Sequence, residues 1–408
     1  MVLRHKRNTA TCSCPSVSPD SHVGSPVSSL HVRHLSLIDV RNYVTAEIDL
    51  PPGPIALVGS NGQGKTNIVE AISYLSTLSS HRVASDAPLV RFGASSARIA
   101  ADVVRDDRSL RVEIEIIPGS SNKGRINNAP VSRPREILGV VRTVVFAPED
   151  LAIVKGDPGD RRRLLDDLIV QRSPRLAGVR SDYDRVIKQR NALLKSAGAA
   201  RRIDMEAVDA TLSVWDEQLA TLGSQLMAAR ADAIDTLRPL AQQVYAQIAP
   251  ASAQLGMTYV TSLGEPASTD VEQTKTRILD EVSTRRKEEL DRGVTLVGPH
   301  RDELALSLGE SPVKGYASHG ESWSVALALR LATYDLLDAE QATPILILDD
   351  VFAELDTSRR SHLAHRVADA SQVFITAAVG DDVPGEVTST WFDVRKDDSG
   401  RAEVTRRG

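Results

Sequence analysis

Residues Ile55 to Leu75 read IALVGSNGQGKTNIVEAISYL and combine a strand pattern, a glycine-rich loop and a helix pattern. The apolar run Ile55 to Val58 is typical of a buried strand, and Ile68, Ile72 and Leu75 recur at helical spacing on one face. The intervening GSNGQGKT matches G-x-x-x-x-G-K-[ST] in the strand, loop and helix setting that this motif requires. The stretch therefore predicts a phosphate-binding loop.

The loop predicts a site for a nucleoside triphosphate such as ATP. Its glycines allow backbone N–H groups to converge, and the following helix adds the positive end of its dipole. Lys65 is expected to reach the outer phosphates, and the Thr66 hydroxyl is expected to bind Mg²⁺. The alternative, a glycine-rich turn of another α/β fold, is disfavoured by the flanking patterns. The expected nucleotide-binding residues are Gly59, Ser60, Asn61, Gly62, Gln63, Gly64, Lys65 and Thr66.

The composition is that of a globular chain large enough for more than one sub-domain. It has 408 residues, 41% of them hydrophobic and 25% charged, with a net charge of −5. Nucleic-acid binding would therefore need a local basic surface, and no apolar run approaches the roughly 18 to 20 residues of a membrane span. Four groups are candidates for such a surface, although each alone is more typical of a solvated helix face: Arg161 to Arg163; Arg185, Lys188 and Arg190; Arg201 and Arg202; and Arg285 to Lys287.

Residues 1–29 differ from the rest of the chain, because they are rich in Ser, Pro, Arg and His and lack the apolar region of a secretory signal. We expect them to be disordered. Cys12 and Cys14, the only cysteines, are separated by one residue, a spacing that supports neither a disulfide framework nor a zinc site. The cysteine-free remainder fits a reducing cytoplasm.

The strand patterns before residue 150 predict an ATPase lobe over residues 30–150. Val32 to Val40 and Ala46 to Leu50 are expected to be paired strands. Ile99 to Val104 and Leu110 to Ile117 alternate and flank a charged turn, which predicts a hairpin. The lobe is thus expected to combine an antiparallel β subdomain with the nucleotide-binding core.

Residues 151–292 have long helical patterns and predict an inserted helical lobe. Apolar residues spaced three and four apart suggest a short coiled coil with a partner helix near Thr274 to Leu290, or ordinary packing of amphipathic helices. The seam consists of Leu212, Trp215, Leu219, Leu222, Leu226, Ala229 and Ala233. The α/β pattern then resumes over 293–395, with strands expected at Val294 to Val297 and Leu304 to Leu308, before a tail at 396–408.

A second acidic motif follows a buried strand. Ile345 to Leu348 precede Asp349 and Asp350, as in a Walker B strand, whose carboxylate holds the Mg²⁺ water shell. Asp350 is suitably placed to orient or deprotonate an attacking water molecule. The alternative is that the two acids only cap the next helix.

Ser318, His319, Gly320 and Glu321 open an apolar helix and form a second potential anion site. Ser and Gly are also ordinary residues at helix starts, so the motif is weak in isolation. The position of the motif ahead of the Walker B strand favours its interpretation as an anion site. A protein whose two copies sandwich ATP requires such a site.

The order of these motifs resembles the ATP-binding-cassette heads of the structural-maintenance-of-chromosomes class and, within it, the RecF family of bacterial DNA gap-repair proteins. The similarity extends from about Leu30 to Thr390. The segments that carry it are HVRHLSLIDVRNY (His31 to Tyr43), SNGQGKTNIVEAI (Ser60 to Ile72), FAPEDL (Phe146 to Leu151), KGDPGDRRRLLD (Lys155 to Asp166), VGPHRDEL (Val297 to Leu304) and LILDDVFAELD (Leu346 to Asp356).

The resemblance implies an α/β fold, namely a P-loop NTPase head of the ATP-binding-cassette type with an antiparallel β subdomain and an inserted helical lobe. It implies catalytic roles for Asp350 and Lys65, metal binding by Thr66 and Asp349, and contacts from Ser318 and Gly320 to the γ-phosphate held by an opposite subunit. It also implies an ATP-dependent homodimer that clamps double-stranded DNA, or its junctions with single strands, and is released by slow hydrolysis. In the family, this activity helps to load RecA with RecO and RecR in the cytoplasm.

Some positions depart from the family pattern. Phe is usual where Val40 stands, and Gln is common at the positions of His319 and Glu321. Members usually start near Leu30, which leads to the hypothesis that residues 1–29 are an untranslated extension. Two alternatives share the motifs: the ATPase subunit of a transporter, and a non-catalytic module that binds partners according to its nucleotide. His300 and Arg301 could act at the site or only brace it.

Overall fold

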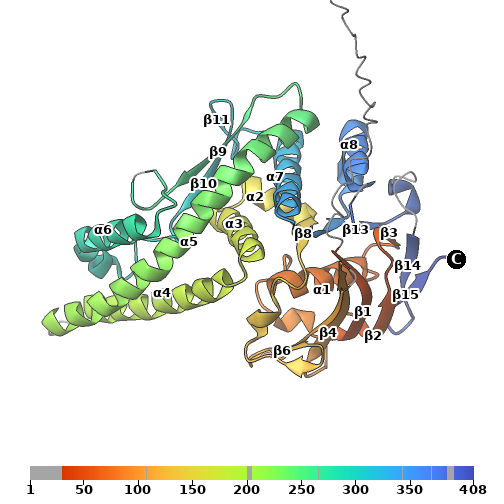
Figure 1. Cartoon of the computed structure of the whole chain (residues 1–408), viewed down its shortest axis with the longest axis horizontal. Coiled ribbons are helices and arrows are strands. Elements are labelled where there is room, and N and C mark those ends of the chain that lie inside the picture. Colours follow the sequence, from red (N-terminus) through yellow and green to blue (C-terminus); the bar gives the residue numbers. More distant parts are fainter. Residues whose placement is uncertain are drawn as a thin grey trace, which may run out of the picture.

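The computed structural model describes residues 30–106, 108–199, 205–264, 266–341, 343–368, 370–383 and 390–408. The expectations for residues 1–29, including Cys12 and Cys14, and for Arg201 and Arg202 lie outside these ranges. Figure 1 shows a β-rich part that contains both sheets of the nucleotide-binding lobe and, beside it, a helical part from which two long helices extend. None of the helices in the described ranges is long and apolar enough to cross a membrane.

The larger α/β layer is a six-stranded sheet in the order β15-β14-β3-β13-β12-β8. Neighbouring strands are parallel except for the β14–β15 pair. The ends of parallel strands share one edge of the sheet, so the residues that follow β3, β12 and β13 meet there. The strands are β3 (Gly53–Val58), β8 (Thr143–Phe146), β12 (Ile345–Asp349), β13 (Gln372–Ala377), β14 (Thr390–Lys396) and β15 (Ala402–Arg406).

The last strand differs from the expected tail at 396–408, because β15 pairs with β14 from Ala402 to Arg406. Its side chains alternate between the buried Ala402 and exposed positions, as an edge strand with one covered face requires. The polar composition of this segment therefore reflects the solvent face of a strand.

A second six-stranded sheet, in the order β2-β1-β4-β5-β6-β7, is antiparallel throughout. The predicted hairpin is confirmed, since Ile99 pairs with Ile114 and Val103 with Leu110. Its inner face packs on α1 (Lys65–Thr77), the helix that follows the phosphate-binding loop. The strands are β1 (Leu30–Val40), β2 (Tyr43–Asp49), β4 (Ala97–Arg105), β5 (Arg108–Ile116), β6 (Lys123–Ile126) and β7 (Ala129–Pro130).

The helical part is organised around α5 (Met205–Ile248), which packs against α3, α4, α6 and α7. Leu219 and Leu226 from the predicted seam lie in the large core, whereas Leu212 packs with Leu194 of α4. Helix α5 thus packs on the expected partner near Thr274 to Leu290, which is part of α6, and also on other helices, which is the ordinary packing alternative. The remaining helices are α2 (Leu151–Lys155), α3 (Pro158–Arg172), α4 (Leu176–Ala199), α6 (Val271–Arg292), α7 (His319–Ala339) and α8 (Thr357–Ala368), and short 3₁₀ turns lie at Ala87–Leu89, Pro134–Ile137, Pro148–Asp150, Phe352–Glu354 and Gly380–Asp382.

A three-stranded sheet, in the order β11-β10-β9, lies within the helical part. Its strands are β9 (Leu255–Val260), β10 (Glu303–Leu308) and β11 (Ser311–Pro312), so β9 and β10 pair across the expected boundary at 292. The domain division itself stays a prediction.

The expected strand at Val294 to Val297 is absent from the described structure. Side chains bind the backbone of this segment in place of a neighbouring strand. The N–H of Thr295 donates to Asn191 Oδ1 at 2.7 Å, and the N–H of Leu296 donates to Glu289 Oε1 at 2.8 Å. The apolar pattern of this segment therefore reflects burial alone.

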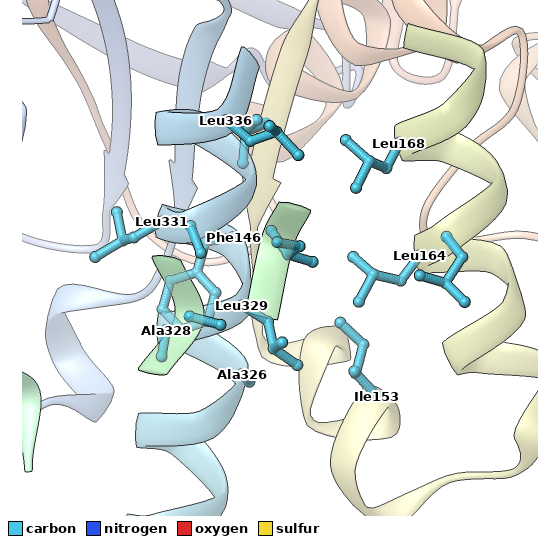
Figure 2. Packing of buried hydrophobic residues seen from close by; sticks show 14 of the residues in the cluster. Phe146, Ile153, Leu164, Leu168, Ala326, Ala328, Leu329, Leu331 and Leu336 are labelled. Atoms are coloured by element: carbon cyan, nitrogen blue, oxygen red, sulfur yellow. The ribbon is translucent and has the colours of Figure 1, made fainter. Parts of the chain in front are cut away.

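Helix α7 connects the two parts of the molecule through a continuous core. Its residues Leu329 and Leu336 face Leu164 and Leu168 of α3, with Phe146 of β8 between them (Figure 2). Because these side chains are fully buried and closely packed, movement of α7 has to be shared with α3 and with the edge of the central sheet.

Candidate functional site

Two positions of the phosphate-binding loop require glycine, Gly64 because of its backbone conformation and Gly59 because another strand lies close to it. Gly64 is the N-cap of α1 with φ of 124°, and a Cβ there would lie 3.0 Å from atoms of Asn42 and Tyr43. A Cβ on Gly59 would lie 2.1 Å from the backbone oxygen of Val394 in β14. The glycines of the motif thus permit both the turn and the close approach of two neighbouring elements.

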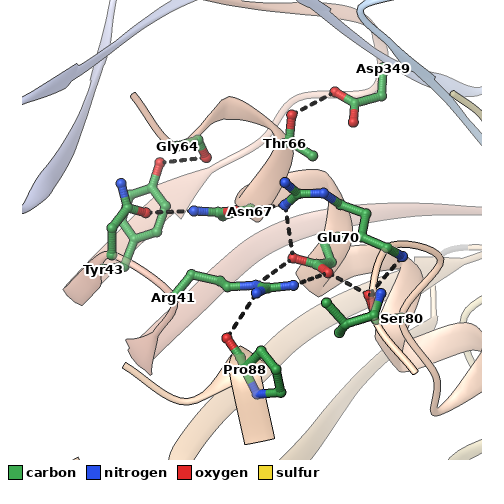
Figure 3. A network of polar contacts seen from close by, with 12 residues as sticks. Arg41, Tyr43, Gly64, Thr66, Asn67, Glu70, Ser80, Pro88 and Asp349 are labelled. Carbon is green, nitrogen blue, oxygen red and sulfur yellow. Dashed lines mark hydrogen bonds and ion pairs between the residues drawn. The ribbon is translucent and has the colours of Figure 1, made fainter. Parts of the chain in front are cut away.

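The turn between β1 and β2 holds this loop in place. Asn42 Nδ2 donates to the carbonyl of Gln63 at 3.0 Å, and the Tyr43 hydroxyl donates to the carbonyl of Gly64 at 3.1 Å. Asn67 in α1 donates to Asn42 Oδ1 at 2.7 Å (Figure 3). The loop is therefore bound from outside its own strand and helix, a role that sequence reasoning did not assign to Asn42 or Tyr43.

Glu70 of α1 also binds the turn between β1 and β2, through Arg41. Arg41 donates to both of its carboxylate oxygens, at 2.6 and 2.9 Å, and Ser80 Oγ donates at 2.5 Å (Figure 3). The Glu70 side chain is 1% exposed. Burial alone would raise the pKa of Glu70, but the hydrogen bonds from Arg41 and Ser80 outweigh it and lower this pKa. Glu70 is thus a buried, ionised anchor.

Lys65 is buried without a counter-ion. It is 3% exposed, and its Nζ donates to the carbonyls of Gly59 at 2.7 Å and Ser60 at 3.4 Å. In the part of the chain that the structure describes, no carboxylate lies within ion-pair distance of this ammonium. A buried positive charge that only neutral groups solvate favours the approach of an anion.

Thr66 and Asp349 meet across the two motifs, with Thr66 Oγ1 3.0 Å from Asp349 Oδ1 (Figure 3). Burial raises the pKa of Asp349 to about 6, and repulsion from Asp350 adds to this effect despite hydrogen bonds from Thr376 and Thr66. A divalent cation would supply the positive charge that this carboxylate lacks. A hydroxyl beside an acidic oxygen is also the donor set that Mg²⁺ takes in P-loop proteins, so these residues fit the ion.

Thr376, at the end of β13, positions both acids, and sequence reasoning missed it. It pairs with Asp349 in the parallel register. Its Oγ1 donates to Asp349 Oδ1 at 2.6 Å and accepts from the N–H of Asp350 at 2.9 Å. Asp350 has φ of 52°, a left-handed conformation that is uncommon for residues other than glycine. The available signal was a threonine that ends a strand beside the Walker B strand.

Ser318 and Gly320 lie at the start of α7. Ser318 Oγ accepts from the N–H of Glu321 at 3.2 Å, and Glu321 Oε2 accepts from the N–H of Ser318 at 2.8 Å. The latter hydrogen bond lowers the pKa of Glu321. Within the described ranges, no hydrogen bond or ion pair joins residues 318–321 to residues 59–66. The chain therefore brings Lys65, Thr66, Asp349 and Asp350 together and leaves Ser318 and Gly320 outside this group.

Several arginines of the candidate basic groups have carboxylate partners within the chain. Arg190 is 0% exposed and pairs with Asp216 at 2.8 Å and Glu289 at 2.6 Å. Arg161 pairs with Glu303 at 2.7 Å. Arg285 and Arg286 also contact carboxylates. Arg161, Arg190 and Arg286 thus link separate elements of the helical part, whereas Arg285 pairs with Glu281 of its own helix. Lys188 and Lys287 remain exposed.

His300 and Arg301 brace the helical part. The Tyr183 hydroxyl lies 2.7 Å from His300 Nδ1, and Arg301 donates to the carbonyl of Thr295 at 2.7 Å. Burial lowers the pKa of His300 to about 4. The neighbouring Asp302 is fully buried and accepts from the hydroxyl of Tyr259 at 2.6 Å. These contacts are those that the bracing alternative requires.

The chain is similar to curated proteins along most of its length. It is 58% identical to the DNA replication and repair protein RecF of Streptomyces avermitilis over 367 residues, which cover 90% of this chain and 98% of the relative. It is 54% identical to the protein of the same name from Frankia alni, over 89% of this chain and 97% of the relative.

Solved structures with the same fold include the recombination mediator protein RecF-ATP in the RecFOR pathway. The match has a TM-score of 0.84 at 25% identity and covers 95% of this chain and 100% of the other. A Smc head domain from Pyrococcus furiosus shares the fold alone, with a TM-score of 0.53 at 16% identity over 93% of this chain and 96% of that domain.

The family comparison agrees with these relatives. The RecF/RecN/SMC N terminal domain matches residues 31–396, which include the phosphate-binding loop, the two acids at the end of β12 and the start of α7. The ATP-binding-cassette head expected from the motif order is therefore confirmed. Together, the domain match and the identity of 58% to a RecF protein establish that the chain belongs to the RecF family of DNA replication and repair proteins.

Proposed function

We propose that this chain is a Mg²⁺-dependent ATPase whose nucleotide state controls its binding to DNA. The observation that carries the proposal is the buried, unpaired ammonium of Lys65 beside the Thr66–Asp349 contact. Gly59 to Thr66 would bind the phosphates, with Lys65 neutralising their charge and Thr66 and Asp349 holding the metal. The bound ion would supply positive charge opposite the terminal phosphates.

Asp350 is the proposed catalytic carboxylate. It follows Asp349 at the edge of the central sheet, and Thr376 fixes its backbone. Its left-handed conformation is a local cost that functional sites commonly retain. Slow hydrolysis would suit a switch, since turnover resets the protein after the ATP-bound state has acted.

Two copies of the chain would complete each other's sites. In the described structure, Ser318 and Gly320 form no hydrogen bond with the phosphate-binding loop of their own chain, and a head-to-tail partner would place them against its ATP. The similarity to a RecF-ATP structure supports ATP as the ligand of the site. ATP would then drive dimer formation because it adds contacts that only the dimer makes.

The proposed ligand of the dimer is DNA, bound at gaps or at junctions between single and double strands. The relatives are named as DNA replication and repair proteins, and a solved relative is a recombination mediator in the RecFOR pathway. Within that pathway the chain would act with RecO and RecR to load RecA, in the cytoplasm. These relatives favour this reading over the motor subunit of a transporter.

The test is fluorescence anisotropy of a labelled gapped duplex, titrated with protein in ATP, in ADP and without nucleotide, at two salt concentrations. We expect binding to require ATP and to weaken steeply with salt, as phosphate contacts do. Lys65→Met is the matched variant and should abolish the effect of ATP. DNA binding that is identical in all nucleotide states would refute the proposal.

A further inference from the structure

His319, the second residue of the Ser318 to Glu321 motif, has a fixed orientation. Its Nε2 lies 3.1 Å from Nε1 of Trp323, one turn along α7. Trp323 is 3% exposed and packs edge-on against Phe146, with ring centroids 5.6 Å apart. An indole N–H can only donate, so Nε2 of His319 is the acceptor. The hydrogen atom of this imidazole is therefore on Nδ1.

Nδ1 of His319 faces a second donor. Nζ of Lys155, at the end of α2, lies 3.4 Å from it. An ammonium has no acceptor capacity, so Lys155 cannot accept a hydrogen bond from Nδ1. The contact thus places two donors side by side without an acceptor. Both side chains are exposed, so a ligand can reach the two donors.

The nearby carboxylates do not neutralise Lys155. Asp157 is 3.5 Å from Lys314, and Asp160 accepts from the N–H of Asp157 at 3.1 Å. Across the described ranges, no carboxylate forms an ion pair with Lys155. A ligand that carries negative charge and accepts two hydrogen bonds, as a phosphate group does, would satisfy both donors.

We propose that Lys155 and Nδ1 of His319 bind the terminal phosphate of the ATP molecule held by a second copy of this chain. The inference rests on the head-to-tail dimer of the proposed function. It adds Lys155, a residue outside the four motif positions and on a different helix, as a positioning residue for the γ-phosphate. ADP lacks this phosphate, so the pair gives the dimer its selectivity for ATP over ADP.

The variants that test the proposal are Lys155→Gln and His319→Phe, with Lys195→Gln as the matched exposed control on α4. Sedimentation velocity gives the dimerisation constant in ATP and in ADP, and a fluorescent ATP analogue at low protein concentration gives the affinity of the monomer. Lys155→Gln should weaken ATP-driven dimerisation about tenfold or more. The ATP affinity of the monomer and the melting temperature should stay unchanged, and Lys195→Gln should dimerise like the wild type.

Mixing variants distinguishes an action on the partner from an action within one chain. Lys65→Met removes the nucleotide site of one chain, and Lys155→Gln weakens the contact that the other chain makes. In the mixed dimer, the ATP of the Lys155→Gln chain faces an intact Lys155. ATP-dependent dimer should therefore reappear on mixing, to a level that neither variant reaches alone.

The failures of the two proposals differ. Wild-type protein that stays monomeric in ATP would overturn the dimer of the proposed function and this inference with it. Normal dimerisation of Lys155→Gln, or an equal loss of ATP affinity in its monomer, would overturn the role of Lys155 alone. Lys155→Arg should dimerise in ATP like the wild type, because arginine retains the positive charge and the hydrogen-bond donors.

Discussion

Thr376 Oγ1 lies 2.6 Å from Asp349 Oδ1 and couples the end of β13 to the Walker B acid. The same oxygen accepts from the N–H of Asp350 at 2.9 Å. One hydroxyl on a neighbouring strand therefore sets the positions of both acids.

Replacing Thr376 by Val should impair hydrolysis more than nucleotide binding. Val has nearly the same shape but neither donates to Asp349 nor accepts from Asp350. A hydrogen bond to a charged group contributes about 1.5 to 3 kcal/mol, so the hydrolysis rate should fall about tenfold to a hundredfold. Single-turnover hydrolysis measures this directly. Thr376→Ser retains the hydroxyl and is the control; if it is as slow as Thr376→Val, the hydrogen bonds are not the cause.

The ionisation of Asp349 should oppose folding of the nucleotide-free protein. Its pKa rises from the usual 3.8 to about 6 on folding. Between these pH values the folded state holds a proton that the unfolded state has lost, so stability falls as pH rises through this window. At about 1.4 kcal/mol per pKa unit, the free energy of unfolding falls by on the order of 2 to 3 kcal/mol across this window.

Asp349→Asn should therefore be more stable than the wild type at pH 8, by on the order of 2 kcal/mol, with the difference shrinking toward pH 4. Urea unfolding at several pH values measures it. The same titration predicts that Mg²⁺-dependent ATP affinity of the wild type declines below about pH 6, as the carboxylate gains its proton. A stability difference that does not change with pH would contradict this account.

Arg41→Ala should destabilise the nucleotide-binding lobe by about 1.5 to 3 kcal/mol, because it removes the two hydrogen bonds from Arg41 to the buried Glu70 and leaves only Ser80 and a longer contact with Arg82 at 3.5 Å. It should also weaken ATP binding, since Asn42 and Tyr43 of the same turn hold the loop. Arg91→Ala is the control in the neighbouring segment. Its pair with Asp39 is about one third exposed and should contribute at most about 1 kcal/mol. Similar unfolding midpoints for the two variants would count against Glu70 as a buried anchor.

Gly59→Ala should abolish ATP binding and lower the melting temperature. The added Cβ would lie 2.1 Å from the backbone oxygen of Val394, and backbone on both sides resists the shift. Gly159→Ala in α3 is the control, because the nearest atom to its Cβ is a flexible Arg162 nitrogen at 3.9 Å. Calorimetry with and without ATP measures both effects, and normal ATP binding by Gly59→Ala would show that β14 can move away.

The sequence predicts the parts of the site that depend on local patterns. The GSNGQGKT loop follows a buried strand, and two acids follow another, so their meeting at one sheet edge is implied by parallel pairing. Thr376 and Asn42 carry no such local pattern, because their roles arise from strand register and from a turn that packs on the loop.

Basic clusters and apolar runs predicted DNA-binding surfaces and strands less well, because contacts with distant parts of the chain decide their roles. Arg161 and Arg190 occur in basic clusters, yet folding brings carboxylates from distant segments to both. Val294 to Val297 is apolar like a strand, but the side chains of Asn191 and Glu289 bind its backbone. Partners that are remote in the sequence decide these cases, and a local pattern does not reveal them.

The contact between β14 and the phosphate-binding loop predicts the effect of mutations near the end of the gene. Lys396 N–H donates to Gln63 Oε1 at 2.5 Å, and β15 covers the free edge of β14. A premature stop codon or frameshift after codon 396 would leave every motif of the coding sequence intact. It would nevertheless remove the strand that protects this edge, so late nonsense alleles should behave as loss of function.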